Sequence, residues 1–72
     1  MFVDMANNTL TLLDTVIVPT LRNTIYQHMG NIMAMRWYFD ENGTEKQRVK
    51  IAFPDGKEKW YEADRVVRFN EA

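Results

Sequence analysis

Apolar and polar residues alternate with a period of two along much of this chain, which is typical of half-buried β-strands. The clearest case is residues 46–53, where Val49, Ile51 and Phe53 fall on one face and Arg48 and Lys50 on the other. Two further stretches, 10–18 (LTLLDTVIV) and 31–39 (NIMAMRWYF), are rich in the β-branched, aliphatic and aromatic side chains that strands favour. The pattern therefore predicts an all-β protein.

Two tight turns divide the second half of the chain into hairpins. Asn42-Gly43 is a strong hairpin signal because both residues accept a positive φ. Pro54-Asp55-Gly56 combines a proline that presets φ with a glycine suited to the left-handed region. The other expected elements are a strand at 57–61, a 3₁₀ turn at 62–64, a last strand at 65–69, and a long first loop at 19–30 that could hold a single helical turn. Five short strands of this kind predict a small closed barrel.

The Asn42-Gly43 hairpin can form in two registers, and a slip of one residue exchanges the two faces of its strands. With a two-residue loop, Arg36 shares the face of Val49 and is buried at a high desolvation cost. With an odd-length loop, Arg36 points outward, and we favour this register for that reason. The favoured register puts Met33, Met35 and Trp37 inside and leaves Ile32, Ala34, Arg36, Tyr38, Arg48 and Lys50 on the outer face. The other register leaves Met33, Met35, Trp37 and Phe39 exposed.

The composition is that of a folded chain, with 46% hydrophobic, 12% aromatic and 26% charged residues among 72. No apolar run reaches the length of a membrane span, and the first residues do not resemble a secretory signal, so we expect a cytoplasmic protein. The net charge is −1, but residues 1–45 carry −3 and residues 46–70 carry +3. This uneven distribution allows a charged surface patch of either sign.

The residue types in the sequence give little support for a catalytic or metal-binding site. There is no cysteine, and the single histidine, His28, cannot form a multi-histidine zinc site. The paired acids Glu62 and Asp64 are better suited to a turn than to general acid–base catalysis. We therefore expect no enzyme activity, no catalytic residue, no cofactor and no metal.

Several motifs together resemble the SH3-like β-barrel superfold, in its KOW/Tudor-type variety. They are Asp14-x-Val16-x-Val18, Gly30-x-Ile32, Val49-x-Ile51-x-Phe53, Pro54-Asp55-Gly56, Trp60 and Ala63-x-x-Val66. The resemblance covers roughly residues 10–70 and identifies no specific family. It implies a closed five-stranded barrel at 10–70, preceded by a tail or extra edge strand at 1–9. Barrels of this kind include peptide binders, readers of methyl marks and translation modules, so the fold alone does not choose a function.

We expect a small non-enzymatic interaction module that binds a protein or peptide, from a bacterial or phage setting. The candidate partner-binding residues are Tyr26, Arg36, Tyr38, Arg48 and Lys50. A groove could include Tyr26, Tyr38 and either Trp60 or Tyr61, with acids Asp40, Glu41 and Glu45 at its rim, although Trp60 itself is expected in the core opposite Ile51.

The alternative is a nucleic-acid-binding barrel, because an aromatic side chain flanked by cations suits base stacking and phosphate contact. The apolar tail residues Phe2, Val3 and Met5 have nothing local to bury them, so we also expect a homodimer or higher oligomer.

Overall fold

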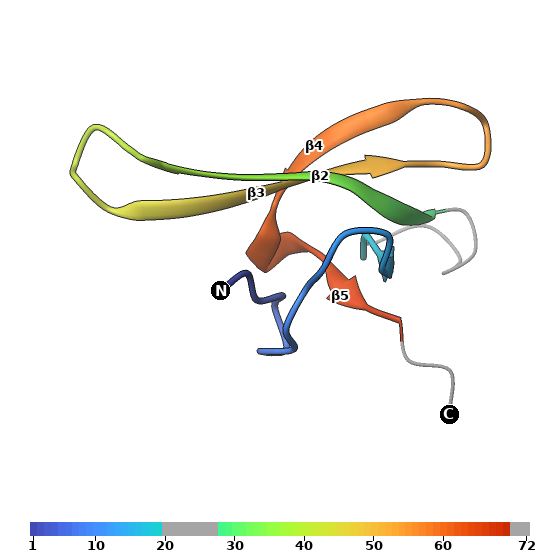
Figure 1. Cartoon of the computed structure of the whole chain (residues 1–72), viewed down its shortest axis with the longest axis horizontal. Helices are drawn as coiled ribbons and strands as arrows, with labels where there is room; N and C mark the ends of the chain where they lie inside the picture. Colours follow the sequence, from blue (N-terminus) through green and yellow to red (C-terminus); the bar gives the residue numbers. More distant parts are fainter. Residues whose placement is uncertain (20–27, 70–72) are drawn as a thin grey trace.

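The computed structural model describes residues 1–19 and 28–69, which form one antiparallel five-stranded sheet (Figure 1). The strands are β1 (Thr15–Ile17), β2 (Met29–Phe39), β3 (Glu45–Ala52), β4 (Glu58–Glu62) and β5 (Val67–Arg68). A 3₁₀ turn, η2 (Ala63–Arg65), precedes β5. The all-β class, the five strands and the 3₁₀ turn before the last strand are confirmed.

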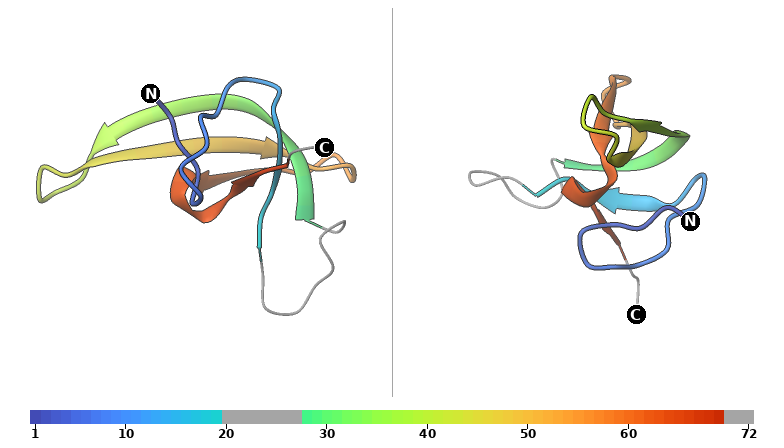
Figure 2. Two further views of the ribbon diagram at one scale, coloured as in Figure 1. Left: turned by 90° about the horizontal axis from the view of Figure 1, so that it is seen from below. Right: turned by 90° about the vertical axis from the view of Figure 1, so that its left-hand side faces the viewer.

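The strand pairing among the described residues does not close the sheet into a barrel. Its order is β4-β3-β2-β1-β5, so β4 and β5 are its two edges, and no ladder joins them within the described residues. Figure 2 shows that the long β2 curves; its residues 29–31 pair with β1, and its residues 31–39 pair with β3. A closed barrel therefore stays a prediction.

One hydrophobic core fills the inner side of the curved sheet. Its buried residues are Leu10, Val16, Val18, Ile32, Val49, Ile51, Ala63 and Val66. Alternate positions of β3 supply Val49 and Ile51, as the period of two predicts. Phe2, Met35, Phe53 and Tyr61 pack against this core from its margins.

A β-bulge in β2 combines features of both predicted registers. Ile32 lies opposite Ile51 and is fully buried, but the register shifts before Ala34, which lies opposite Lys50. Beyond the bulge Met35 lies opposite Val49 and faces inward, as the odd-length loop requires, and residues 40–44 separate the two strands. Placing Met33 in the core and Ile32 outside was wrong, because one extra residue in β2 exchanges the faces of its first half.

The first strand is shorter than expected. Residues 11–14 form a turn instead, in which Asp14 N–H donates to the Thr11 carbonyl and Asp14 Oδ2 accepts from Thr11 N–H. Leu13 has a φ of 73°, a left-handed conformation that is incompatible with an extended strand at this position. Leu12 and Leu13 are consequently exposed, and β1 begins only at Thr15.

Residues 1–9 fold back onto the rest of the chain. A bridge pairs Val3 with Thr9, and Met5 N–H donates to the Val66 carbonyl. Gln47 of β3 holds the segment from the other side, since its side chain accepts from Val3 N–H and donates to the Met1 carbonyl. The apolar tail residue Phe2 thus finds its packing against this chain's own core.

Asp4 fastens this N-terminal segment to β5. The carboxylate is buried and accepts four hydrogen bonds, from the Ala6, Asn8 and Arg68 backbone N–H groups and from Asn8 Nδ2, at 2.6–3.0 Å. Burial would raise the pKa of Asp4, but these hydrogen bonds to its charged form together hold the pKa below its ordinary value.

Candidate binding face

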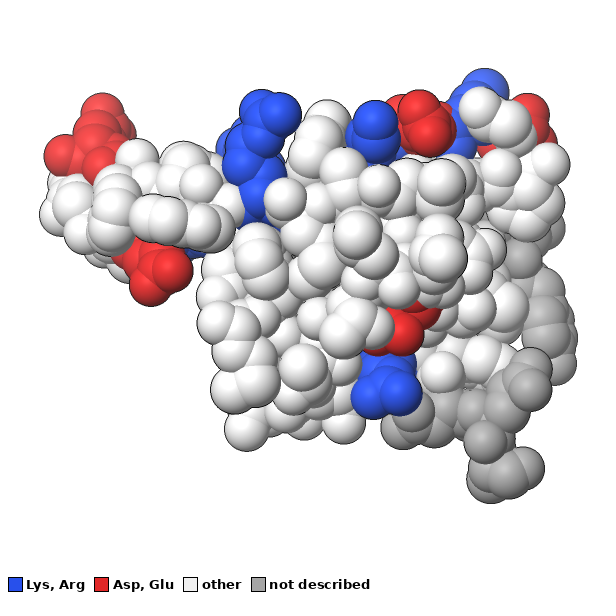
Figure 3. Space-filling view, in the orientation of Figure 1, with Lys and Arg blue, Asp and Glu red and all other residues white. Residues whose placement is uncertain are grey.

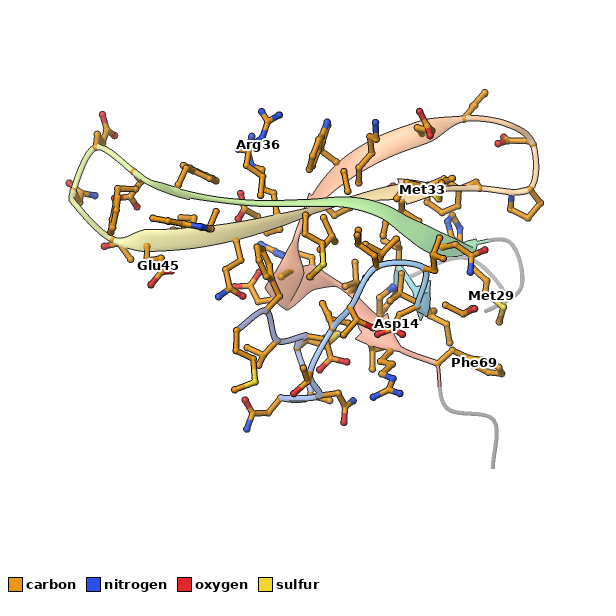
Figure 4. All side chains as sticks on the ribbon, in the orientation of Figure 1. Asp14, Met29, Met33, Arg36, Glu45 and Phe69 are labelled. Atoms are coloured by element: carbon orange, nitrogen blue, oxygen red, sulfur yellow. The ribbon has the colours of Figure 1, made fainter. Side chains whose placement is uncertain are left out.

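The sheet surface that faces away from the core over β2, β3 and β4 is called here the outer face. Strand pairing arranges it in rows: Ala34, Lys50 and Trp60 form one, and Arg36, Arg48 and Glu62 form the next. Tyr38 and Lys46 make a third row toward the β2–β3 turn. Figure 4 shows Arg36 projecting from the sheet on this side. Each row follows the last by two residues, or about 6.8 Å along a strand.

Trp60 has two cations close to its ring on this face. The Arg36 guanidinium is 5.2 Å from its ring centroid, and the Lys50 ammonium is 5.8 Å away. The prediction that Trp60 is a core residue opposite Ile51 was wrong, because Lys59 occupies that position and Trp60 lies opposite Lys50. The inward-facing aromatic of β4 is its neighbour Tyr61, which packs edge-on against Phe53.

A hydrogen-bonded trio occupies the adjacent part of the face. The Tyr38 hydroxyl donates to Glu62 Oε1 at 2.8 Å, and Arg48 Nε donates to the same oxygen at 3.0 Å. The Arg48 guanidinium also covers the Tyr38 ring at 4.7 Å from its centroid. The trio therefore fixes an aromatic ring and a cation in one orientation.

Titration within the trio follows from these contacts. The hydrogen bond to Glu62 raises the pKa of Tyr38, since it stabilises the protonated phenol. Burial would raise the pKa of Glu62, but the hydrogen bonds from Tyr38 and Arg48 outweigh it and lower the pKa. The hydrogen bond to Glu62 also raises the pKa of Arg48. All three groups thus keep their ordinary charge at neutral pH.

The outer face is more basic than the chain as a whole. It carries the cations Arg36, Lys46, Arg48 and Lys50 and the acids Glu58 and Glu62. Both acids have basic neighbours, since Glu58 Oε1 lies 3.9 Å from Lys50 Nζ and Glu62 Oε1 accepts a hydrogen bond from Arg48 Nε. Figure 3 shows basic atoms along this edge of the molecule, with acidic atoms among them toward the β3–β4 turn, and further acidic atoms at the tip of the β2–β3 hairpin. The hairpin tip acids are Asp40, Glu41 and Glu45.

Four of the five sequence-predicted binding residues come together on this face: Arg36, Tyr38, Arg48 and Lys50. The fifth, Tyr26, lies outside the described residues, and with it the proposed aromatic cage. Sequence reasoning missed Lys46 and Trp60 as members of the same face. Lys46 could have been found from its period-two spacing to Arg48 and Lys50.

The predicted peptide groove is assembled only in part within the described residues. Tyr38 and one alternative, Trp60, share the outer face, whereas the other alternative, Tyr61, packs against the core on the other side. Of the expected rim acids, Asp40 is used within the turn, where its Oδ1 accepts from the Asn42 and Thr44 N–H groups. The described residues therefore bring Tyr38 and Trp60 of the proposed groove onto one face, without Tyr61.

A second exposed surface lies beneath the β2–β3 hairpin, which projects beyond the core (Figure 1). Trp37 and Phe39 are 56% and 61% exposed and contact each other edge-to-face, with centroids 5.5 Å apart. Both alternate with the outer-face residues, so they occupy the inner side of the hairpin, where the described residues leave them largely uncovered. Met1, 88% exposed, is bonded through its carbonyl to Gln47, the residue opposite Trp37. We call Met1, Trp37 and Phe39 the hairpin underside.

A pocket of about 480 Å³ lies at the opposite end of the sheet, where β2 begins. Met29, Met33, Phe53 and Phe69 are among its apolar lining residues, and Asn31 and Thr15 are among its polar ones. Asn31 Nδ2 donates to Thr15 Oγ1 at 3.1 Å and to the Leu13 carbonyl at 3.2 Å, which fixes the orientation of the amide.

Residues 1–19 and 28–69 contain no candidate metal site and no candidate membrane-spanning helix. This part of the chain contains no cluster of three or more potential metal ligands. None of its helices is long and apolar enough to cross a membrane. No family model, curated protein or solved structure matches this chain.

Proposed function

We propose that this protein is a non-enzymatic binding module and that its outer face binds single-stranded nucleic acid. The observation that carries the proposal is the exposed Trp60 ring with two cations near it, beside the Tyr38–Arg48 stack. Aromatic rings provide stacking platforms for bases, and neighbouring Lys and Arg side chains neutralise phosphates. Neither requirement depends on base identity, so the expected binding has little sequence preference.

The open side of the sheet supports the same proposal. Three strands present their outer side chains over a continuous surface, and no described element covers it. The strand order and the 3₁₀ turn before β5 also agree with the SH3-like superfold, which we propose as the architecture of the chain. That superfold accommodates many functions, so the proposal depends on the side chains of the face.

Fluorescence anisotropy with labelled single-stranded DNA and RNA of about 12 nucleotides tests the proposal at low salt. Trp60→Ala should weaken binding about 5- to 150-fold, corresponding to the ~1–3 kcal/mol that one stacked base contributes. The double variant Arg36→Ala/Lys46→Ala should also weaken it. Its matched control is Lys57→Ala/Lys59→Ala, which makes the same change in net charge away from the outer face and should bind nearly as well as the wild type.

Two outcomes would overturn the proposal. One is the absence of binding at low ionic strength by protein whose circular dichroism shows a folded sheet. The other is equal binding of a polyglutamate peptide of the same length, which would show a general preference for anionic chains.

We also propose a protein partner for the hairpin underside, in line with the predicted protein-binding module. The specific observation is the exposed Trp37–Phe39 pair, because large aromatic side chains dominate binding energy at protein interfaces. A second copy of this chain is the first partner to test, by sedimentation equilibrium of the wild type and of Trp37→Gln. The expected result is a self-associating wild type and a more monomeric variant. A wild type that stays monomeric at high concentration would contradict self-association.

A further inference from the structure

The pocket at the start of β2 is continuous with the outer face. Ala52 lines the pocket and follows Lys50 by two residues on the same face of β3. Met33 lines it from β2, at the bulge that directly precedes Ala34 of the Trp60 row. Figure 4 shows Met33 on the same side of β2 as Arg36. A ligand lying along the face toward this end therefore reaches the pocket about one row, or 6.8 Å, beyond Lys50.

The pocket also marks the place where the outer face ends. Beyond Ala52 the chain turns through Phe53 and Pro54, and both residues form part of the pocket wall. The Phe53 N–H donates to the Lys57 carbonyl at 2.9 Å, which holds this wall to the start of β4. A single-stranded ligand that follows the outer face therefore reaches the end of the β3 ladder beside the pocket.

The lining has the chemistry of a site for a flat, partly polar ring. Met29, Met33 and Phe69 supply polarisable apolar surface, and Figure 4 shows Met29 and Phe69 near one another at this end of the molecule. Thr15 Oγ1 accepts a hydrogen bond from Asn31, so its own hydroxyl hydrogen remains a donor. The Asn31 amide oxygen adds an acceptor in a fixed orientation. Mostly apolar walls with a few convergent polar groups are characteristic of small-ligand sites of about 300–1,000 Å³.

We propose that this pocket receives the terminal base of a single strand bound along the outer face. The proposal rests on the proposed nucleic-acid function and specifies one end of its binding site. A nucleobase fits the observations because it is flat, is apolar on its faces, and carries donors and acceptors on its edge. A terminal base fits better than an internal one because the outer face ends beside the pocket, where β3 gives way to Phe53 and Pro54.

Oligonucleotides lacking one base test the pocket separately from the face. Anisotropy titrations would compare an intact strand with strands carrying a single abasic position at the 5′ end, the centre or the 3′ end. The expected result is that one terminal abasic position, and not the other, weakens binding about 5-fold or more. Met33→Gln changes the pocket wall without changing charge, and it should weaken binding of the intact strand while leaving the affinity for that abasic strand unchanged.

These experiments distinguish a wrong inference about the pocket from a wrong proposal about the outer face. If the intact strand binds in a Trp60-dependent way, but both terminal abasic strands bind as tightly as the intact one, the pocket inference is overturned and the proposed function stands. The pocket inference is overturned in the same way if folded Met33→Gln loses affinity equally for intact and abasic strands. If no strand binds the wild type, both proposals fall together.

Discussion

Asp4 shows how one carboxylate organises an N-terminal segment that the hydrophobic pattern does not explain. It is buried among four hydrogen-bond donors that belong to the residue 6–8 turn and to β5. Charged hydrogen-bond acceptors contribute about 1.5–3 kcal/mol each, and donors left without an acceptor add a desolvation cost. The carboxylate thus joins segments separated by 64 residues.

The first prediction concerns Asp4→Asn, which keeps the size of the side chain but replaces an acceptor oxygen by an NH₂ donor. We expect it to lower the free energy of unfolding by about 2–4 kcal/mol, because the new NH₂ group would face N–H donors that now bond to the Asp4 carboxylate. Urea unfolding monitored by tryptophan fluorescence measures the effect. The matched control is Asp55→Asn, an exposed turn residue, which should cost less than about 1 kcal/mol. Equal effects would contradict the special role of Asp4.

The lowered pKa of Asp4 gives a second prediction, on pH dependence. Its folded pKa lies below the unfolded value of about 3.9, so the carboxylate contributes its full stabilisation above that pH. The contribution is lost as pH falls through the folded pKa. The difference in unfolding free energy between wild type and Asp4→Asn should therefore be constant from neutral pH to about 5 and shrink below about 4. A difference that stays constant down to pH 3 would show that Asp4 is not the titrating group.

Strand β2 has a close contact that only glycine permits. A Cβ atom built on Gly30 would lie 2.5 Å from the Ala52 carbonyl oxygen and 2.5 Å from Ile51 Cγ2. The carbonyl belongs to the backbone of β3 and cannot rotate away, so the two strands would have to separate where β2 curves.

The third prediction is that Gly30→Ala destabilises the protein by about 1–3 kcal/mol, the range of overpacking substitutions. Thermal unfolding followed by circular dichroism provides the measurement. Gly43→Asn is the control, because Gly43 has a positive φ of 77° that Asn tolerates and has open space around it. A Gly30→Ala protein as stable as this control would show that the strands can move apart at little cost.

At the level of elements, the strand pairing after the turns was predictable and the irregular positions were not. Gly43 and Gly56 both adopt the positive φ that the turn motifs require, and the odd-length loop correctly placed Arg36 outward. The bulge after Ile32 could not be predicted, because neither Met33 nor Ala34 is a residue type that signals an irregular strand. Trp60 was misplaced because it was expected opposite Ile51, whereas the actual register pairs it with Lys50 and thereby decides its face.

Charge separation along the molecule belongs to the scale of the whole structure. The outer face carries four cations and two acids, whereas the acids Asp40, Glu41 and Glu45 lie at the hairpin tip next to its Tyr38–Lys46 end. A polyanion on the face is therefore attracted over the middle of the sheet and repelled at the tip. This polarity would direct a bound strand toward the pocket end, away from the hairpin turn.

The fourth prediction tests this repulsion with Glu41→Gln, since the Glu41 side chain is exposed at the tip. Removing the charge should tighten binding of a single strand a few-fold at low salt, and the gain should vanish at about 0.15 M salt, where the Debye length is about 8 Å. Asp64→Asn, an exposed acid in η2, makes the same charge change away from the face and should leave binding nearly unaltered. Equal gains from both variants would mean that only the net charge of the protein matters. The affinity would then reflect general attraction, and the arrangement of side chains on the outer face would have no directing role.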